Sequence, residues 1–149
     1  RRAERHGGQV TLLFSDIDHF KKINDTYGHL VGDQVLRRVA QVVQAQARTI
    51  DVAARYGGEE FAIILDSTDL AGGRLMAERI RQEVQKLVLQ SDKGSFSCTL
   101  SLGIATFPDD ATEPRLLIES ADQALYHAKR NGRNQSVTSR EAGGVRTAA

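Results

Sequence analysis

The chain has 149 residues, of which 40 % are hydrophobic and 26 % are charged, and its formal net charge is +1. A domain of this length buries about 68–70 % of its unfolded surface, so the composition predicts one globular domain. The near-zero charge excludes a global field that would attract nucleic acid or anionic lipid. The longest apolar run, Phe61–Leu65, is too short to cross a bilayer, and no signal peptide opens the chain. We therefore expect a cytoplasmic domain without nucleic-acid or membrane contact.

The first part of the chain predicts one strand followed by two helices. The apolar run Val10–Asp16 has the length of a strand and ends in a carboxylate. A short helix is expected over Lys21–Tyr27, and valines at helical spacing predict a longer one from Asp33 to about Arg48. Asp33 directly follows Gly32, which is where an acid at a helix N-terminus is expected.

A hairpin is predicted next. Val52–Tyr56 and Phe61–Leu65 are rich in β-forming residues and flank Gly57 and Gly58. A Gly-Gly pair supplies the positive φ angles of a tight hairpin turn. The two segments are therefore expected to be antiparallel neighbours.

The remaining elements are a helix, a strand and a helix. Helical periodicity spans about Asp69–Val88, and strict alternation over Ser95–Ile104 predicts a strand with one apolar face. Cys98 lies on that face, where we expect a buried and inert thiol, and as the single cysteine it excludes an internal disulfide. Pro114 marks the start of the last helix, which ends at Asn131-Gly132.

This order of elements predicts an α+β fold, in which helices pack around a central, mostly antiparallel sheet. The first strand is expected in the centre of that sheet, beside the hairpin. We assign residues 1–138 to one domain. From Ser139 onward the sequence has no periodicity, so residues 139–149 are expected to form a disordered tail.

Acidic residues are expected to meet at one end of the sheet. Asp16 ends the first strand, and Glu59 and Glu60 lie at the tip of the hairpin. Mg²⁺ needs only a few carboxylate or carbonyl oxygens, because water and substrate phosphates supply its remaining ligands. The pattern indicates a metal–nucleotide site. The alternative is that Asp16 merely ends a strand and that Glu59 and Glu60 are solvent-exposed acids that keep a turn soluble.

The segment Arg55–Phe61, which reads RYGGEEF, closely resembles the signature of GGDEF-domain diguanylate cyclases, in the variant with Glu at the third position. Other blocks resemble the family in the same order, namely Asp16–Lys21, Asn24–His29, Gly32-Asp33 and Ala124–Asn134. The resemblance runs from about Gln9 to Val137. It implies the palm-like fold of nucleotide cyclases and polymerases, and the condensation of two GTP into cyclic di-GMP with release of two pyrophosphates.

The resemblance implies five residues at the reaction centre. Asp16 and Glu59 would bind Mg²⁺ through their side chains and Ile17 through its carbonyl oxygen, with Mn²⁺ as an alternative metal. Paired metals stabilise the entering and leaving oxygens of such a transfer. Glu59 would accept or relay the 3′-hydroxyl proton, and Glu60 would hold a second metal or orient the ribose; the division between them stays open. Lys21 would neutralise charge on the phosphates, and its alternative is a solvated helix lysine.

Four residues resemble the family's contacts with the triphosphate. The backbone amides near His19 and Phe20 would hold the phosphates. Lys129 and Arg133 flank the end of the last helix and would clamp the triphosphate. Without the resemblance, these two would be ordinary charges that complement a helix dipole.

Three residues resemble the family's contacts with the nucleoside. Asn24 and Asp33 would read guanine, because guanine offers its N1–H and N2–H₂ donors to one carboxylate and adenine lacks that pair. A site built to satisfy such bonds discriminates by roughly 10⁴–10⁵. Asp33 as a simple helix-start acid is the alternative. His29 falls at another nucleotide-lining position, or it only supports the loop around Gly28.

Arg48 and Asp51 match the RxxD inhibitory site of the family, where the product binds. Arg48 can give paired hydrogen bonds to a phosphate or a guanine edge, and Asp51 can accept from guanine. Arg79 corresponds to a further arginine of that site in some members. The alternatives are a surface pair at a helix end for Arg48 and Asp51, and an exposed helix arginine for Arg79.

The resemblance also implies partners. Each copy would hold one GTP while the product joins two, so two copies are expected to pair head to head. Arg1-Arg2 resemble the end of a segment that follows an upstream sensory domain, so we expect an excised catalytic domain, whose full-length protein could be membrane-anchored through the missing region. A second hypothesis is a catalytically silent cyclic di-GMP receptor, which the intact acids disfavour; acceptance of ATP is disfavoured by Asp33.

Overall fold

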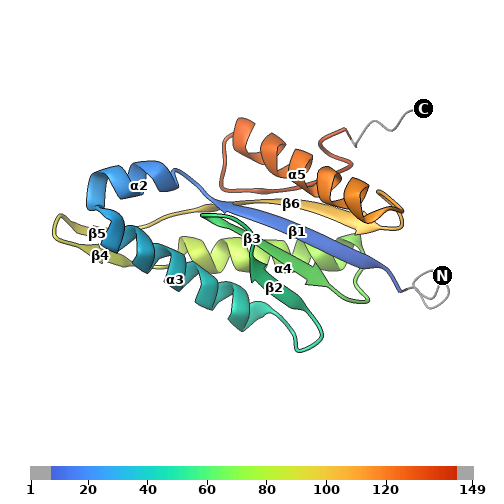
Figure 1. Ribbon diagram of the computed structural model, residues 1–149, viewed down its shortest axis with the longest axis horizontal. Helices are drawn as coiled ribbons and strands as arrows, with labels where there is room; N and C mark the ends of the chain where they lie inside the picture. Colours follow the sequence, from blue (N-terminus) through green and yellow to red (C-terminus); the bar gives the residue numbers. More distant parts are fainter. Residues whose placement is uncertain (1–7, 144–149) are drawn as a thin grey trace.

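A five-stranded sheet with the strand order β2-β3-β1-β6-β7 carries the fold (Figure 1). The computed structural model describes residues 8–143. The strands of this sheet are β1 (Val10–Ile17), β2 (Val52–Arg55), β3 (Glu60–Leu65), β6 (Leu100–Phe107) and β7 (Ser136–Thr138). The helices are α2 (Phe20–Tyr27), α3 (His29–Gln46), α4 (Leu70–Gln85) and α5 (Pro114–Arg130), and β4 (Leu89–Ser91) and β5 (Gly94–Phe96) form a separate hairpin.

The sheet is mixed, and β1 is its central strand. β1 is antiparallel to both β3 and β6, and β2 is antiparallel to β3, whereas β7 is parallel to β6. The expected α+β class and the central position of the first strand beside the hairpin are confirmed.

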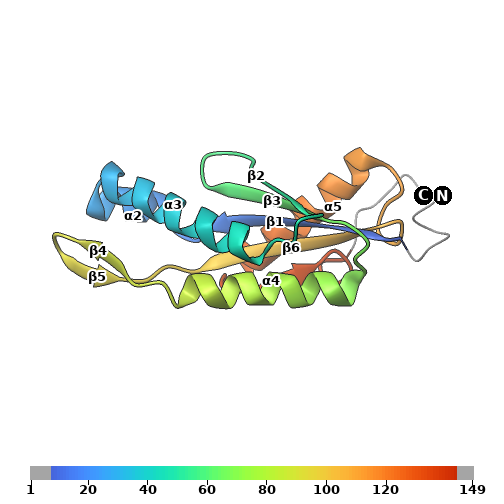
Figure 2. The same cartoon turned by 90° about the horizontal axis from the view of Figure 1, so that it is seen from below.

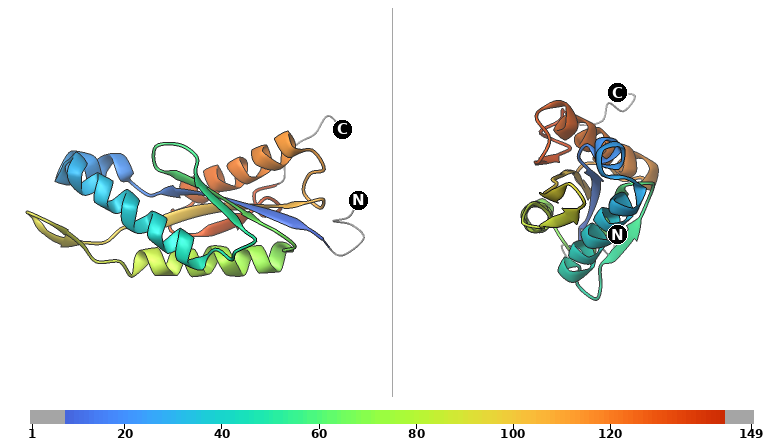
Figure 3. Two further views of the ribbon diagram at one scale, coloured as in Figure 1. Left: turned by 60° about the horizontal axis from the view of Figure 1, so that its bottom comes forward. Right: turned by 90° about the vertical axis from the view of Figure 1, so that its left-hand side faces the viewer.

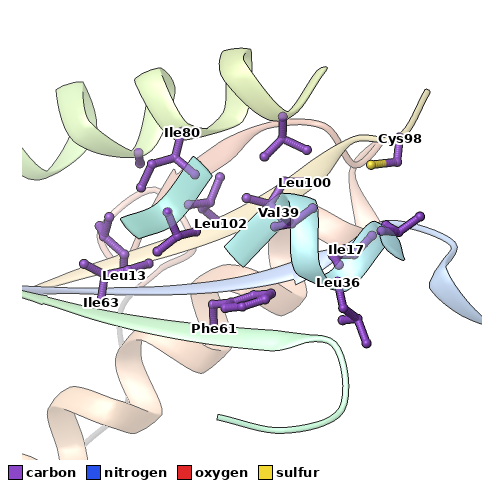
Figure 4. Packing of buried hydrophobic residues seen from close by; sticks show 14 of the residues in the cluster. Leu13, Ile17, Leu36, Val39, Phe61, Ile63, Ile80, Cys98, Leu100 and Leu102 are labelled. Atoms are coloured by element: carbon purple, nitrogen blue, oxygen red, sulfur yellow. The ribbon is translucent and has the colours of Figure 1, made fainter. Parts of the chain in front are cut away.

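Helices cover both faces of the sheet. α3 and α4 pack on one face and α5 on the other (Figure 2). Side chains alternate along a strand, so Leu13 and Ile17 of β1 point to the α3–α4 face, and Leu12 and Phe14 point to the α5 face. By the same alternation, Asp16 lies on the α5 side. Figure 4 shows Val39 and Ile80 of the two helices gathered with Leu13 and Leu102 of the sheet.

β6 differs from the expected one-sided strand. Residues 97–99 separate it from β5, and Leu100–Thr106 are buried on both faces, because α4 and α5 sandwich the strand. A Cβ added to Gly103 would lie only 2.2 Å from the carbonyl oxygen of Ala121 in α5. Cys98 is buried as expected, and burial raises the pKa of its thiol to about 11; a thiol with that pKa is inert.

Two local expectations are wrong. α3 begins at His29, so Asp33 lies inside the helix and is not an acid at its start. Gly57 and Gly58 do not adopt positive φ angles. Their loop closes differently, because the amides of Tyr56 and Gly57 both donate to the carbonyl oxygen of Glu60 (2.7 and 3.4 Å).

The expected tail does not begin at Ser139. Ser139 is buried and its amide donates to the carbonyl oxygen of Ile104 (2.7 Å), while Glu141 binds the amide of Thr138 (2.9 Å) and the side chain of Arg74. Residues 139–143 therefore pack against the domain, and 144–149 lie outside the described residues. Within residues 8–143, no helix has the length and apolar character needed to span a membrane.

Candidate functional site

Three carboxylates meet where β1 ends beside the β2–β3 hairpin. Asp16 is 2 % exposed and pairs in register with Glu60 of β3. The amide of Ile17 donates to the carbonyl oxygen of Glu59 (3.4 Å), which ties the hairpin loop to the strand end. The strand pairing thus brings Asp16, Glu59 and Glu60 together, as their positions in the sequence predict.

Burial and the nearby Asp16 raise the pKa values of both hairpin acids. The pKa of Glu59 is raised by burial and by the negative charge of the neighbouring Asp16. The pKa of Glu60 is raised by burial and by the charges of Asp16 and Asp122. Like charges that are crowded and partly buried are costly to ionise without a cation.

Lys129 of α5 supplies positive charge to this cluster. Its ammonium group donates to Asp16 Oδ2, and its charge partly offsets the raised pKa values of Glu59 and Glu60. The other oxygen, Asp16 Oδ1, is buried without a hydrogen-bond partner. An unpartnered carboxylate oxygen amid further acids fits a divalent cation.

Side chains alone would not complete the coordination of a cation at this site. Among residues 8–143, no three or more His, Cys, Asp or Glu side chains are arranged to hold a metal ion. Mg²⁺ takes carbonyl, water and phosphate oxygens together with one or two carboxylates. Asp16 and Glu59, together with a backbone carbonyl oxygen such as that of Ile17, could therefore hold a metal whose remaining ligands are water and phosphate oxygens.

Two further residues, whose roles the sequence alone does not reveal, position the site. The guanidinium of Arg55 donates one hydrogen bond to the carbonyl oxygen of Gly57 (3.3 Å) and two to that of Gly58 (3.1 and 2.8 Å). These bonds hold the loop before Glu59. Asp18 is buried and accepts from the hydroxyls of Thr99 and Ser101 (2.7 Å each). In the sequence, Arg55 lies in the block Arg55–Phe61 and Asp18 in the block Asp16–Lys21. Membership of these blocks is the signal that could have indicated their roles.

Asp18 also fixes the segment that carries Arg133. It accepts a third hydrogen bond from the amide of Asn134 (3.0 Å). Arg133 and Asn134 both have positive φ angles (62° and 48°), and the Nε of Arg133 is buried without a hydrogen-bond partner. Arg133 therefore keeps a donor free next to the end of α5.

α2, which begins three residues after the end of β1, carries a second group of predicted site residues. His19 precedes the helix with φ 58°, and no side chain caps the helix N-terminus. Lys21 is exposed and pairs with Asp25 (3.3 Å) instead of contacting the acids. The Asn24 side chain lies against Gly32, where an added Cβ would be 1.8 Å from its Oδ1.

Asp33 and His29 are both exposed on the first turns of α3. The contact of Asn24 with Gly32 places Asn24 next to the residue that precedes Asp33. α2 and α3 thus present Asn24 and Asp33 near each other, with His29 at the start of α3.

Arg48 and Asp51 are together but paired with each other. The guanidinium of Arg48 forms two hydrogen bonds to the Asp51 carboxylate (3.0 and 2.7 Å) and also binds Thr68 Oγ1 (2.8 Å). The Asp51 side chain is fully covered; burial alone would raise its pKa, but the bonds and charge of Arg48 outweigh burial and hold it below its usual value. Arg79 is exposed on α4 and shares no hydrogen bond with either residue within the described part of the chain.

Comparison with known proteins identifies the family. Residues 1–135 match the family described as "Diguanylate cyclase, GGDEF domain". Diguanylate cyclase A of Treponema denticola is 42 % identical over 131 residues, which are 88 % of this chain and 35 % of that protein. Response regulator PleD of Caulobacter vibrioides is 41 % identical over 139 residues, 92 % of this chain and 31 % of that protein. This chain spans about a third of the length of these curated relatives.

Solved structures agree. The GGDEF domain of DgcB from Caulobacter crescentus, crystallised in complex with c-di-GMP, is 40 % identical with a TM-score of 0.85, covering 93 % of this chain and 82 % of that one. The active GGEEF domain of a diguanylate cyclase from Vibrio cholerae is 34 % identical with a TM-score of 0.84, covering 93 % and 88 %. The expected palm-like cyclase fold is confirmed by these neighbours. The chain therefore belongs to the GGDEF-domain family of diguanylate cyclases.

Proposed function

We propose that this domain condenses two GTP into cyclic di-GMP and releases two pyrophosphates. The observation that carries the proposal is the meeting of Asp16, Glu59 and Glu60 beside Lys129, with Asp16 Oδ1 buried and unpartnered. This arrangement suits a metal–triphosphate complex, and the family membership of the chain names the reaction.

Asp16, Glu59 and the carbonyl oxygen of Ile17 would hold Mg²⁺, or Mn²⁺ in its place. When bound, the metal stabilises negative charge on the entering and leaving oxygens. Glu59 would accept or relay the proton of the attacking 3′-hydroxyl, and its raised pKa brings it closer to the value that a general base needs at neutral pH. Glu60 would orient the ribose or hold a second metal.

The triphosphate would lie between the end of α5 and the start of α2. Lys129 and Arg133 would bind its oxygens, and Arg133 Nε is a donor without a partner in the described chain. The backbone amides at His19 and Phe20 belong to the uncapped N-terminus of α2, where an anion is favoured. Lys21 would swing from Asp25 to the phosphates.

Guanine would lie against α2 and α3. The Asp33 carboxylate would accept hydrogen bonds at its Watson–Crick edge, the Asn24 amide would contact the base beside it, and His29 would line the same side. Asp33 is exposed without an ion-pair partner within residues 8–143, so its carboxylate is available for the N1–H and N2–H₂ donors.

Each domain would bind one GTP, so the reaction would need two copies that face each other. Regions outside this chain, which the longer relatives have, would bring the copies together and respond to a signal. The product would bind Arg48 and Asp51 with help from Arg79 and inhibit turnover. The DgcB domain was crystallised with c-di-GMP, which supports a product site in this family.

A product assay tests the proposed reaction. The chain, dimerised through a fused coiled coil, is incubated with GTP and Mg²⁺, and cyclic di-GMP is measured by chromatography. Glu59→Gln should abolish product, while Glu83→Gln, which removes an exposed acid paired with Lys86 on α4, should retain it. Cyclic di-GMP binding without any product would favour the receptor function instead.

A further inference from the structure

The β4–β5 hairpin lies outside the main sheet and beside the tip formed by α2 and α3 (Figure 3). Leu89 anchors its base in the core. Its turn is closed by a hydrogen bond from the Ser91 hydroxyl to the carbonyl oxygen of Gly94 (2.8 Å). The hairpin carries none of the residues assigned to GTP, to the metal or to the product.

Two contacts join the hairpin to α2. The rings of Tyr27 and Phe96 stack with centroids 4.0 Å apart and planes 7° from parallel. The ammonium group of Lys93 donates to the carbonyl oxygen of Thr26 (2.8 Å). A cavity of about 480 Å³, lined by Leu30, Gln34 and Gln90 among others, lies between the hairpin and α3. The hairpin therefore holds this tip mainly through the last turn of α2.

That turn also contains Asn24. The carbonyl oxygen of Asn24 accepts from the amide of Gly28, which ends the helix (2.8 Å), and the Asn24 side chain lies against Gly32 of α3. α2 has eight residues, and a helix of this length is marginal by itself in water. Its orientation, and with it the position of Asn24 relative to Asp33, depends on tertiary contacts.

We propose that the β4–β5 hairpin is a specificity-determining brace, in which Phe96 and Lys93 hold the last turn of α2 so that Asn24 and Asp33 stay in register with guanine. This inference rests on the proposed function, in which these two residues read the base. A hydrogen-bonding site discriminates between bases only while its groups are held at the correct geometry. In enzymes, a misplacement of about 1 Å can lower the reaction rate about 10²-fold. Phe96 and Lys93 are positioning residues and touch no substrate.

Calorimetry with two analogues tests the brace. Guanosine and adenosine 5′-(α,β-methylene)triphosphates carry the same unreactive triphosphate, but adenine lacks the N1–H and N2–H₂ donors that Asp33 accepts in the proposed function. The parent chain with Mg²⁺ should bind the guanosine analogue more tightly. Phe96→Ala and Lys93→Met should weaken guanosine binding by about tenfold and leave adenosine binding within about twofold, so that discrimination falls. Phe96→Tyr, which keeps the stack, should restore discrimination.

Ser95→Ala is the matched control, because Ser95 is exposed on the hairpin and bonds only Gln90 within the described chain. Equal weakening of both analogues by Phe96→Ala and by Lys93→Met, or unchanged discrimination in both, would overturn the brace. A parent chain that does not prefer guanosine would instead contradict the proposed function. Two variants are used so that poor folding of Phe96→Ala leaves Lys93→Met to decide.

Discussion

Lys129 and Asp16 form an ion pair that joins the last turn of α5 to the end of β1, 113 residues apart in the sequence. Asp16 is buried, and its second oxygen has no hydrogen-bond partner. In this structure Lys129 is therefore the counter-ion of a carboxylate that also suits a divalent cation. The same lysine is assigned to the triphosphate, so binding of metal and GTP would require it to change partners.

Lys129→Met should destabilise the domain. A fully buried ion pair loses roughly 3–5 kcal/mol when one partner is removed; about a third of the Lys129 side chain is exposed, so a loss of about 2 kcal/mol is expected. Urea unfolding in EDTA measures it. Arg130→Met, which removes an exposed cation stacked on Tyr126, is the control and should change stability by less than about 0.5 kcal/mol.

Mg²⁺ should rescue Lys129→Met. A cation that replaces the lost ammonium stabilises the folded state by mass action, so the melting temperature of this variant should rise more with Mg²⁺ than that of the parent. An equal response of both proteins to Mg²⁺ would show that Lys129 does not compete for the metal position.

The raised pKa of Glu59 predicts a pH-dependent stability. Its carboxyl group ionises at about pH 4.3 in the unfolded chain and at higher pH in the folded one. Between these values the folded state binds more protons, so the free energy of unfolding falls as pH rises through that window. Glu59→Gln lacks this term, and its stability relative to the parent should increase from pH 4 to pH 7 in metal-free urea titrations. A stability difference between the variant and the parent that does not change with pH would contradict the raised pKa of Glu59.

Gly103→Ala should be strongly destabilising, because the new Cβ would lie 2.2 Å from the carbonyl oxygen of Ala121 and 2.3 Å from the amide of Leu125. Both are backbone atoms of α5, so the helix itself would have to move. Overpacking costs about 1–3 kcal/mol where side chains can adjust, and a loss at or above about 3 kcal/mol is expected here. Gly58→Ala, which meets no atom within 4 Å, is the control. Equal unfolding midpoints for the two variants would contradict the close α5–β6 contact.

Arg48→Ala should relieve product inhibition. The substitution removes the paired donors proposed for cyclic di-GMP and leaves Asp51 covered without its counter-ion. Initial-rate assays with added cyclic di-GMP should show an inhibition constant raised at least about tenfold, as expected for the loss of a charge-assisted bidentate contact. Arg38→Ala on the exposed side of α3 is the control. Inhibition equal to that of the parent would remove Arg48 from the product site.

Local sequence patterns predicted the longer elements because their signals lie within single windows. The apolar run of β1, the β2–β3 hairpin and the periodic helices α4 and α5 are all present within a few residues of their expected bounds. The strands β4, β5 and β7 have three residues each, which is too short for periodicity to show. β7 exists because Ser136–Thr138 pair with Leu102–Ile104 of β6, a partner that no local window contains.

The sequence by itself determined the family and the identity of the acidic and basic residues, because motif blocks are runs of consecutive residues and can be recognised without a structure. It also predicted that Asp16 meets Glu59 and Glu60, but only the tertiary structure decided the other contacts among these residues. It joined Asp16 to Lys129, paired Arg48 with Asp51, buried Asp18 under Thr99 and Ser101, and set the hairpin against α2. Such contacts depend on strand register and helix packing between distant segments, and these arise from burial of the whole core, not from any local pattern.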